Sequence, residues 1–114
     1  MITFTVRMTF PPASREAVNE ALAKLSRASR EEPGCLHYLA HWVEGEAATC
    51  LIYEMYRDPA AVDAHRSTSH FAEHAVGVLY QLMLDRQVEP LLAVQPASDW
   101  SSGASYPQGP MGAR

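Results

Sequence analysis

The sequence predicts an α+β fold of the ferredoxin-like kind, a four-stranded antiparallel sheet with helices on one face. The expected elements follow the order strand, helix, strand, strand, helix, strand along residues 2–95. The two middle strands carry large apolar residues on both faces, and a chain of 114 residues has too few helices to cover both. We therefore expect a second subunit on the uncovered face, which gives a homodimer formed through the sheet.

The first strand and the first helix have the clearest patterns. Residues 2–10 alternate between apolar and mixed positions, as in a strand with one buried face. Pro11 and Pro12 end the strand, and Ser14 is the expected N-cap of a helix over residues 15–30. The helix is predicted from apolar residues at helical spacing, namely Val18, Ala21, Leu22, Leu25 and Ala28.

The segment that begins at Glu32 joins this helix to the second strand. Pro33 disfavours helical geometry at the residue before it, and Gly34 is able to adopt the positive φ of a sharp helix exit. A strand to about Val43 is expected to follow. Its alternation predicts one face with Cys35, His37, Leu39 and His41, and another with Leu36, Tyr38, Ala40 and Trp42.

A hairpin at residues 45–48 is predicted to lead into a third strand over residues 49–57. One face of this strand carries Glu54 among apolar residues, so this carboxylate needs a partner or a function. Cys35 and Cys50 are expected to be reduced core residues. The chain starts without a basic region followed by an apolar run, and we expect a cytoplasmic protein.

The remaining chain is predicted to contain a broken helix, a last strand and an irregular arm. Asp58 and Pro59 start a short helix, and residues 67–69 separate it from a longer one over 70–84. A fourth strand is expected over 86–95, which completes a domain of residues 1–95. Ten of the 19 residues from 96 to 114 are Pro, Gly or Ser, so an irregular arm is predicted, anchored on the same or a partner subunit by Trp100, Tyr106 and Met111.

Composition excludes two classes of partner. The net charge is −4 and the nine Lys and Arg residues are scattered, which argues against a nucleic-acid partner. No apolar run approaches the roughly 20 residues of a membrane-spanning helix. We expect neither nucleic-acid nor membrane binding.

Four short motifs together resemble the antibiotic biosynthesis monooxygenase family of dimeric α+β barrel proteins. They are Glu32-Pro33-Gly34-Cys35, then Tyr38 with His41, then Leu51-Ile52-Tyr53-Glu54-x-Tyr56, and Ala61-x-x-Ala64-His65-x-x-x-Ser69-His70-Phe71. The resemblance implies a homodimer whose sheets close into a barrel, with a pocket between sheet and helices in each subunit. It also implies oxidation of an electron-rich aromatic, such as an anthrone or quinol, to a quinone with O₂ and without metal or flavin. Tyr56 stands where the family often has Trp, and Ile52 where some members have Asn.

His41, Tyr56 and His65 are the expected catalytic residues. Oxygenation without a cofactor requires a base that turns the substrate into an anion, and a neutral imidazole such as that of His41 suits this task. Tyr56 is expected to orient the substrate ring by hydrogen bonding or stacking. The structural alternative is that His41 and Glu54 form a core pair that fixes the strands.

Glu54, Arg7, His70 and Arg86 are expected to bind substrate. Arg7 pairs with Glu54 or binds an anionic oxygen of the substrate, and His65 and His70 are placed at the pocket mouth. His70 and His74 are four residues apart, but no sequence motif completes a set of metal ligands, so no metal and no cofactor are expected. Two alternatives stay open: a regulatory dimer that binds a small hydrophobic molecule, and a haem protein with His65 or His70 as axial ligand.

Overall fold

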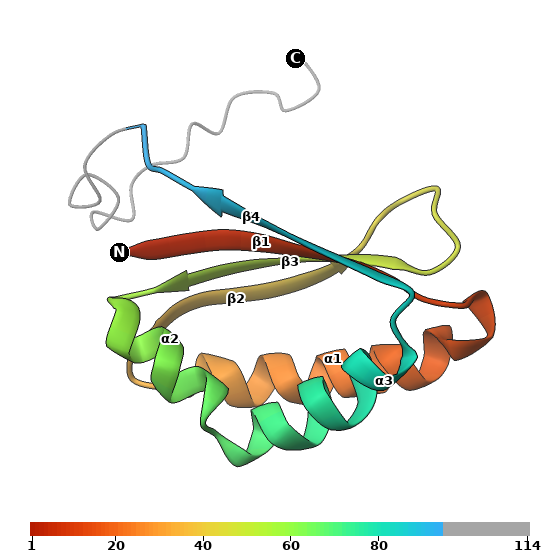
Figure 1. Cartoon of the computed structure of the whole chain (residues 1–114), viewed down its shortest axis with the longest axis horizontal. Helices are drawn as coiled ribbons and strands as arrows, with labels where there is room; N and C mark the ends of the chain where they lie inside the picture. Colours follow the sequence, from red (N-terminus) through yellow and green to blue (C-terminus); the bar gives the residue numbers. More distant parts are fainter. Residues whose placement is uncertain (95–114) are drawn as a thin grey trace.

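A computed structural model describes residues 1–94 and confirms the predicted fold class. Its four strands are β1 (Ile2–Thr9), β2 (Cys35–Trp42), β3 (Thr49–Tyr56) and β4 (Asp85–Leu91), and they form one antiparallel sheet in the order β2-β3-β1-β4. Helices α1 (Arg15–Arg30) and α2 (Pro59–Arg66) cover one face, together with a third helical segment after α2 (Figure 1). This is the strand order of the ferredoxin-like plan.

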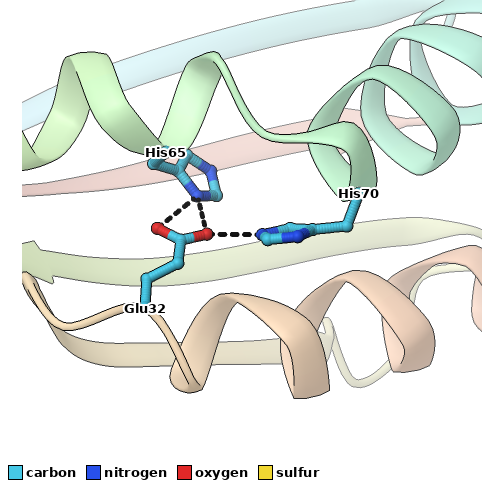
Figure 2. Close-up of side chains that lie close together, drawn as sticks. All are labelled: Glu32, His65 and His70. Atoms are coloured by element: carbon cyan, nitrogen blue, oxygen red, sulfur yellow. Dashed lines mark hydrogen bonds and ion pairs between the residues drawn. The ribbon is translucent and has the colours of Figure 1, made fainter.

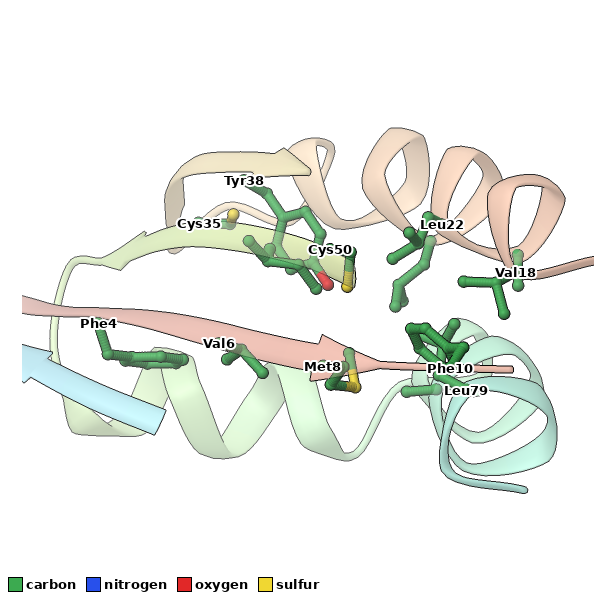
Figure 3. Close-up of a cluster of buried hydrophobic side chains, with 14 of the residues drawn as sticks. Phe4, Val6, Met8, Phe10, Val18, Leu22, Cys35, Tyr38, Cys50 and Leu79 are labelled. Atoms are coloured by element: carbon green, nitrogen blue, oxygen red, sulfur yellow. The ribbon is translucent and has the colours of Figure 1, made fainter. Parts of the chain in front are cut away.

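The core lies between the sheet and the helices because alternate residues of β1 point toward α1. Phe4, Val6 and Met8 face the helices, and Val6 pairs with Ile52 of β3 on one side and with Val88 of β4 on the other. Figure 3 draws these β1 side chains in one buried cluster with Val18 and Leu22 of α1. The predicted alternation of the first strand is confirmed.

A β-bulge near the start of β2 overturns the alternation expected there. Cys35 lies opposite Tyr56 and His37 opposite Met55, so Leu36 is an extra residue in this strand. The bulge places Cys35 on the helix face, with Tyr38, Ala40 and Trp42, rather than with His37. His37, Leu39 and His41 therefore lie on the face without helices, which we call the open face.

The turn at Gly34 requires glycine because a neighbouring helix approaches it closely, and not because of the positive φ that we predicted. Among the described residues Gly45 has a positive φ of 86° and Gly34 does not. A Cβ on Gly34 would overlap the Ala61 side chain, while the Gly34 carbonyl accepts a 2.9 Å hydrogen bond from the Arg57 N–H. The missing side chain thus lets the first turn of α2 pack on the entry to β2.

The two helix starts differ from each other in how they are capped. A 3₁₀ turn, η1 (Pro12–Ser14), precedes α1, and Ser14 has helical φ and ψ of −90° and −3° with no side-chain cap bond. The predicted cap at Ser14 is therefore wrong. The cap at Asp58 is confirmed, because its Oδ1 accepts from Ala61 N at 2.8 Å.

The helix predicted over residues 70–84 is present but is wound more widely than an α-helix. Segment η2 (Phe71–Leu79) has π-type winding and continues into one α-helical turn, α3 (Tyr80–Leu82). Thr68 Oγ1 accepts from Phe71 N at 3.1 Å and so caps the start of this segment. Ala75 and Leu79 are buried, and η2 packs along α1.

The end of the chain is described only in part. Strand β4 ends at Leu91, earlier than the predicted end at Gln95. The expected anchors of the arm at 96–114, Trp100, Tyr106 and Met111, lie outside the described residues. Within residues 1–94, no helix is long and apolar enough to cross a membrane.

The open face carries large apolar side chains on its outer strands. Leu39 of β2 is 44% exposed, and Leu91 of β4 is exposed as well. Leu39 pairs with Tyr53 and Leu91 with Thr3, which places both on the face opposite the core. In Figure 1 the helices all lie on the other side of the sheet.

Candidate functional site

Five polar side chains meet between the sheet and α2, and we call them the polar cluster. They are Glu32, Glu54, Tyr56, His65 and His70. The Tyr56 hydroxyl donates to Glu54 Oε1 at 2.6 Å, and His65 Nε2 lies 4.0 Å from the same oxygen. On the other side of the His65 ring, Nδ1 lies 2.9 Å from Glu32 Oε2, and His70 Nε2 approaches that oxygen at 2.5 Å (Figure 2). The cluster thus links a buried carboxylate to one near the surface through a single imidazole.

Glu32 reaches the cluster because the chain turns sharply after α1. Its N–H donates to the Ser29 carbonyl at 3.0 Å, and its own carbonyl accepts from Cys35 N at 3.1 Å. Pro33 stands inside this turn and prevents α1 from continuing. In Figure 2 the Glu32 side chain points from the turn toward both histidines.

Three aromatic rings surround the His65 imidazole. The side chain is buried, with a residue exposure of 3%, and its ring lies 5.7 Å from Tyr38, 5.3 Å from Tyr56 and 5.1 Å from Phe71, which it meets edge-on. Burial lowers the pKa of His65, and the Glu32 carboxylate opposes that shift. The rings fix the imidazole so that each nitrogen faces a carboxylate.

Glu54 is a buried carboxylate at the floor of a small pocket, with 5% of its surface exposed. Burial raises its pKa to about 7, while the Tyr56 hydrogen bond acts in the opposite direction. Burial and the Glu54 charge raise the pKa of Tyr56, so its hydroxyl stays protonated and donates. Glu54 is therefore able to accept a proton near neutral pH.

The pocket above Glu54 is narrow and has basic residues at its edge. Its free volume is about 30 Å³, room for one or two water molecules. Phe4, Tyr38 and Phe71 are among the wall residues, and the exposed Arg66 and Arg86 line it as well. The Arg86 guanidinium lies 5.4 Å from the centre of the Tyr80 ring.

The structure brings together five of the residues expected from the sequence. Tyr56, Glu54, His65 and His70 belong to the polar cluster, and Arg86 lines the pocket. His65 is buried inside rather than at the pocket mouth, because α2 packs on the sheet at this point. His70 is only partly buried and borders a surface groove.

The structure places His41 and Arg7 outside the polar cluster. Tyr38, not His41, lies opposite Glu54, and His41 is exposed on the open face opposite Leu51. The expectation that His41 lies beside Glu54 is wrong. The expected Arg7–Glu54 pair is also wrong, because Arg7 sits on the open face, 4.0 Å from Glu46.

Sequence reasoning missed Glu32 and Phe71 as members of this site. The sequence around Glu32 indicates only a turn, whereas its two contacts are with residues 33 and 38 positions later in the chain. No local periodicity reports such a contact. The one available signal was that Glu32 and His65 belong to motifs of the same family resemblance.

The polar cluster also contains a set of metal-type ligands. Glu32, His65 and His70 each offer one ligand atom, and these atoms lie within 4.8 Å of one another. Two imidazoles with one carboxylate are a ligand set that transition-metal ions accept.

Comparisons with known proteins agree with this architecture. The family described as antibiotic biosynthesis monooxygenase matches residues 1–76. Among solved structures, PA3566 of Pseudomonas aeruginosa is 29% identical with a TM-score of 0.76, and the match covers 82% of this chain and 94% of that one. A structure named antibiotic biosynthesis monooxygenase is 25% identical with a TM-score of 0.77, over 83% and 100% of the two chains.

Two further relatives show how much of this chain is matched in other proteins. Protein SO0527 of Shewanella oneidensis is 26% identical with a TM-score of 0.72, over 79% of this chain and 87% of that one. An uncharacterized Synechocystis protein, sll1783, is 42% identical over 45 residues. That match spans 40% of this chain and 31% of the Synechocystis protein.

Proposed function

The chain belongs to the antibiotic biosynthesis monooxygenase family, and from this membership and the buried carboxylate of Glu54 we propose that it oxidises an electron-rich aromatic substrate with O₂. The substrate class we propose is an anthrone or quinol, and the product is a quinone. The observation that carries the proposal is a buried carboxylate in a small pocket between sheet and helices, with a phenol as its hydrogen-bond donor.

The reaction needs a base because only the substrate anion transfers an electron readily to O₂. For an anthrone, Glu54 removes a proton from the ring carbon, and the anion passes its electrons to O₂ and forms a peroxide at that carbon. Loss of water from the peroxide leaves the quinone carbonyl. One oxygen atom enters the product and the other leaves as water, so the substrate supplies all the electrons.

The other pocket residues have supporting roles in this proposal. Tyr56 donates to Glu54 and orients it, and the His65 ring limits its movement from the opposite side. Arg66 and Arg86 supply positive charge at the pocket edge, which favours the phenolate or enolate form of the substrate. His41 is not among the residues that line this pocket, because it lies on the open face.

A ring substrate needs more room than the present cavity of about 30 Å³. The side lined by Arg66, Tyr80 and Arg86 is where we expect the pocket to open. Arg66 and Arg86 are exposed, whereas Phe4, Val6 and Tyr38 belong to the packed core. Opening there moves the fewest buried side chains.

We also propose that the protein works as a homodimer joined through the open face. The supporting observations are the exposed Leu39 and Leu91 on a sheet face that the helices leave bare. The family's proteins are generally dimeric, which agrees with this arrangement.

The test is oxygen consumption by the full chain with a simple anthrone or dihydroxynaphthalene, with EDTA present and no added flavin. Glu54→Gln should lower turnover by roughly 10²–10⁴, the usual effect of losing a general base. Glu16→Gln, an exposed carboxylate on α1, is the matched control and should retain full turnover. Equal turnover in wild type and Glu54→Gln would contradict the proposal.

The aromatic pocket walls formed by Phe4, Tyr38 and Phe71 also suit a second function, a non-catalytic dimer that binds a small hydrophobic molecule. Saturable binding of the anthrone without oxygen consumption would support this reading. A Soret band after haem addition would instead support the haem-binding alternative, with His65 or His70 as axial ligand.

A further inference from the structure

We propose that Glu32, His65 and His70 form a binding site for a divalent transition-metal ion of the Zn²⁺, Co²⁺ or Fe²⁺ class. This inference goes beyond the proposed function, which uses no metal. It rests on the positions of three ligand atoms, on the carboxylate behind one of them and on the groove beside them.

The ligand atoms already converge on a common point. The Glu32 Oε2 atom faces both His65 Nδ1, at 2.9 Å, and His70 Nε2, at 2.5 Å. Ligand atoms around a tetrahedral ion with bonds of about 2.0–2.1 Å lie roughly 3.3 Å apart, so small outward shifts of these side chains would admit the ion. In Figure 2 both rings point at the carboxylate from α2 and from the start of the next helix.

His65 has a second carboxylate, that of Glu54, near the ring nitrogen that faces away from Glu32. Its Nδ1 is the atom near Glu32, and its other nitrogen faces the Glu54 carboxylate at 4.0 Å. Metal-binding histidines typically direct the second ring nitrogen to a carboxylate or carbonyl, which fixes the tautomer and the ring orientation. The Tyr56 hydroxyl holds Glu54 in turn, so the polar cluster contains both a ligand shell and its support.

A surface groove supplies an entry path and room for a further ligand. Glu32 and His70 line it, with Lys24, Arg27, Glu31, Glu73 and His74 among its other residues. Three protein ligands beside an open groove leave at least one position for water, as in zinc sites that are not purely structural. Within this groove, Lys24 is already paired with Glu20 at 2.9 Å, which moderates its repulsion of a cation.

The ligand types select among metals. Two imidazoles and one carboxylate favour Zn²⁺, Co²⁺ or Fe²⁺ over Mg²⁺ and Ca²⁺, which prefer oxygen ligands alone. The competing interpretation is a metal-free cluster, in which both histidines only hydrogen-bond Glu32. The two interpretations differ in whether the EDTA-treated protein takes up one ion per chain.

The experiment titrates the EDTA-treated full chain with Co²⁺, followed by visible absorption and calorimetry. We expect one Co²⁺ per chain, displacement by Zn²⁺ and no competition from Mg²⁺. His70→Asn and Glu32→Gln should each weaken binding by more than about 100-fold, and Glu54→Gln by about 10–100-fold, the usual loss for a supporting carboxylate. His70 is partly exposed, so His70→Asn should fold, and a thermal melt of each variant checks this.

His74→Asn is the matched control, because His74 lies four residues from His70 and lines the same groove. It should bind Co²⁺ as the wild type does. Absence of stoichiometric Co²⁺ binding by the wild type, retained binding in both His70→Asn and Glu32→Gln, or an equal loss in His74→Asn would each overturn the assignment. These measurements involve no substrate, whereas the oxygen-consumption test is run in EDTA, so either proposal is able to fail without the other.

Discussion

Gly34 shows how a single absent side chain positions the polar cluster. The entry to β2 and the first turn of α2 approach so closely here that a methyl group on Gly34 would overlap Ala61. Glu32 lies two residues before this contact and His65 lies on the same short helix as Ala61. The contact therefore sets the spacing between the turn and the helix that carry Glu32 and His65.

Gly34→Ala should destabilise the fold by about 1–3 kcal/mol, because the added methyl group overpacks this contact. Ala61→Gly should cost about 1–2 kcal/mol, through lower helix propensity and the loss of a buried methyl group. The double variant should recover much of the Gly34→Ala loss, since the next nearest atom, Ala61 Cα, is at an ordinary 3.4 Å. Urea unfolding of the three variants measures this, and strictly additive losses would show that the contact is not the cause.

The two cysteines are buried, free thiols, as predicted. Burial raises the pKa of both Cys35 and Cys50 to about 11. At pH 8 only about one thiol in 10³ is then the reactive thiolate, compared with roughly a quarter for an ordinary exposed cysteine. Iodoacetamide should label the folded protein very slowly and the urea-unfolded protein fast, as followed by mass spectrometry. Rapid labelling of either cysteine in the folded state would contradict the burial seen here.

At the scale of elements, the two helix starts form a natural comparison. The Asp58 carboxylate accepts from the first turn of α2, while Ser14 makes no side-chain cap bond at α1. Asp58→Ala should lower the free energy of unfolding by about 1 kcal/mol, and Ser14→Ala should change it by much less. Chemical denaturation of both variants measures the free energy of unfolding. Equal losses of this free energy would mean that the Asp58 bond contributes nothing.

The sequence predicted the strands and helices correctly. It did not predict features that depend on contacts between residues far apart in the chain. The strands and α1 were predictable because apolar residues recur with a period of two or 3.6 along them. The bulge at Leu36 was not predictable, because an extra residue in one strand is recognised only from its pairing with the neighbouring strand. Glu54 and Tyr56 were found because a polar residue interrupts an apolar pattern, whereas Glu32 follows a helix end, where a carboxylate is ordinary.

At the scale of the molecule, one bare sheet face determines the expected assembly. Leu39→Lys places a charge on the open face, within the proposed dimer contact, and should shift the protein from dimer to monomer without unfolding it. Leu84→Lys, an exposed residue between α3 and β4, is the matched control and should leave the mass unchanged. Light scattering at micromolar concentration distinguishes the two. A wild-type monomer would remove the dimer from the proposal.

The bulge in β2 also makes the spacer between α1 and the sheet one residue longer than a regular strand requires. Residues 37–42 keep their faces whether or not Leu36 is present, because Cys35 and His37 would then simply alternate. Deleting the Leu36 codon should therefore preserve the fold and leave Cys35 opposite Tyr56, so Glu32 should keep its place beside His65. The bulge then absorbs one added residue without moving the carboxylate between its two histidines, so the length of this segment is able to change at Leu36 while the polar cluster stays in place.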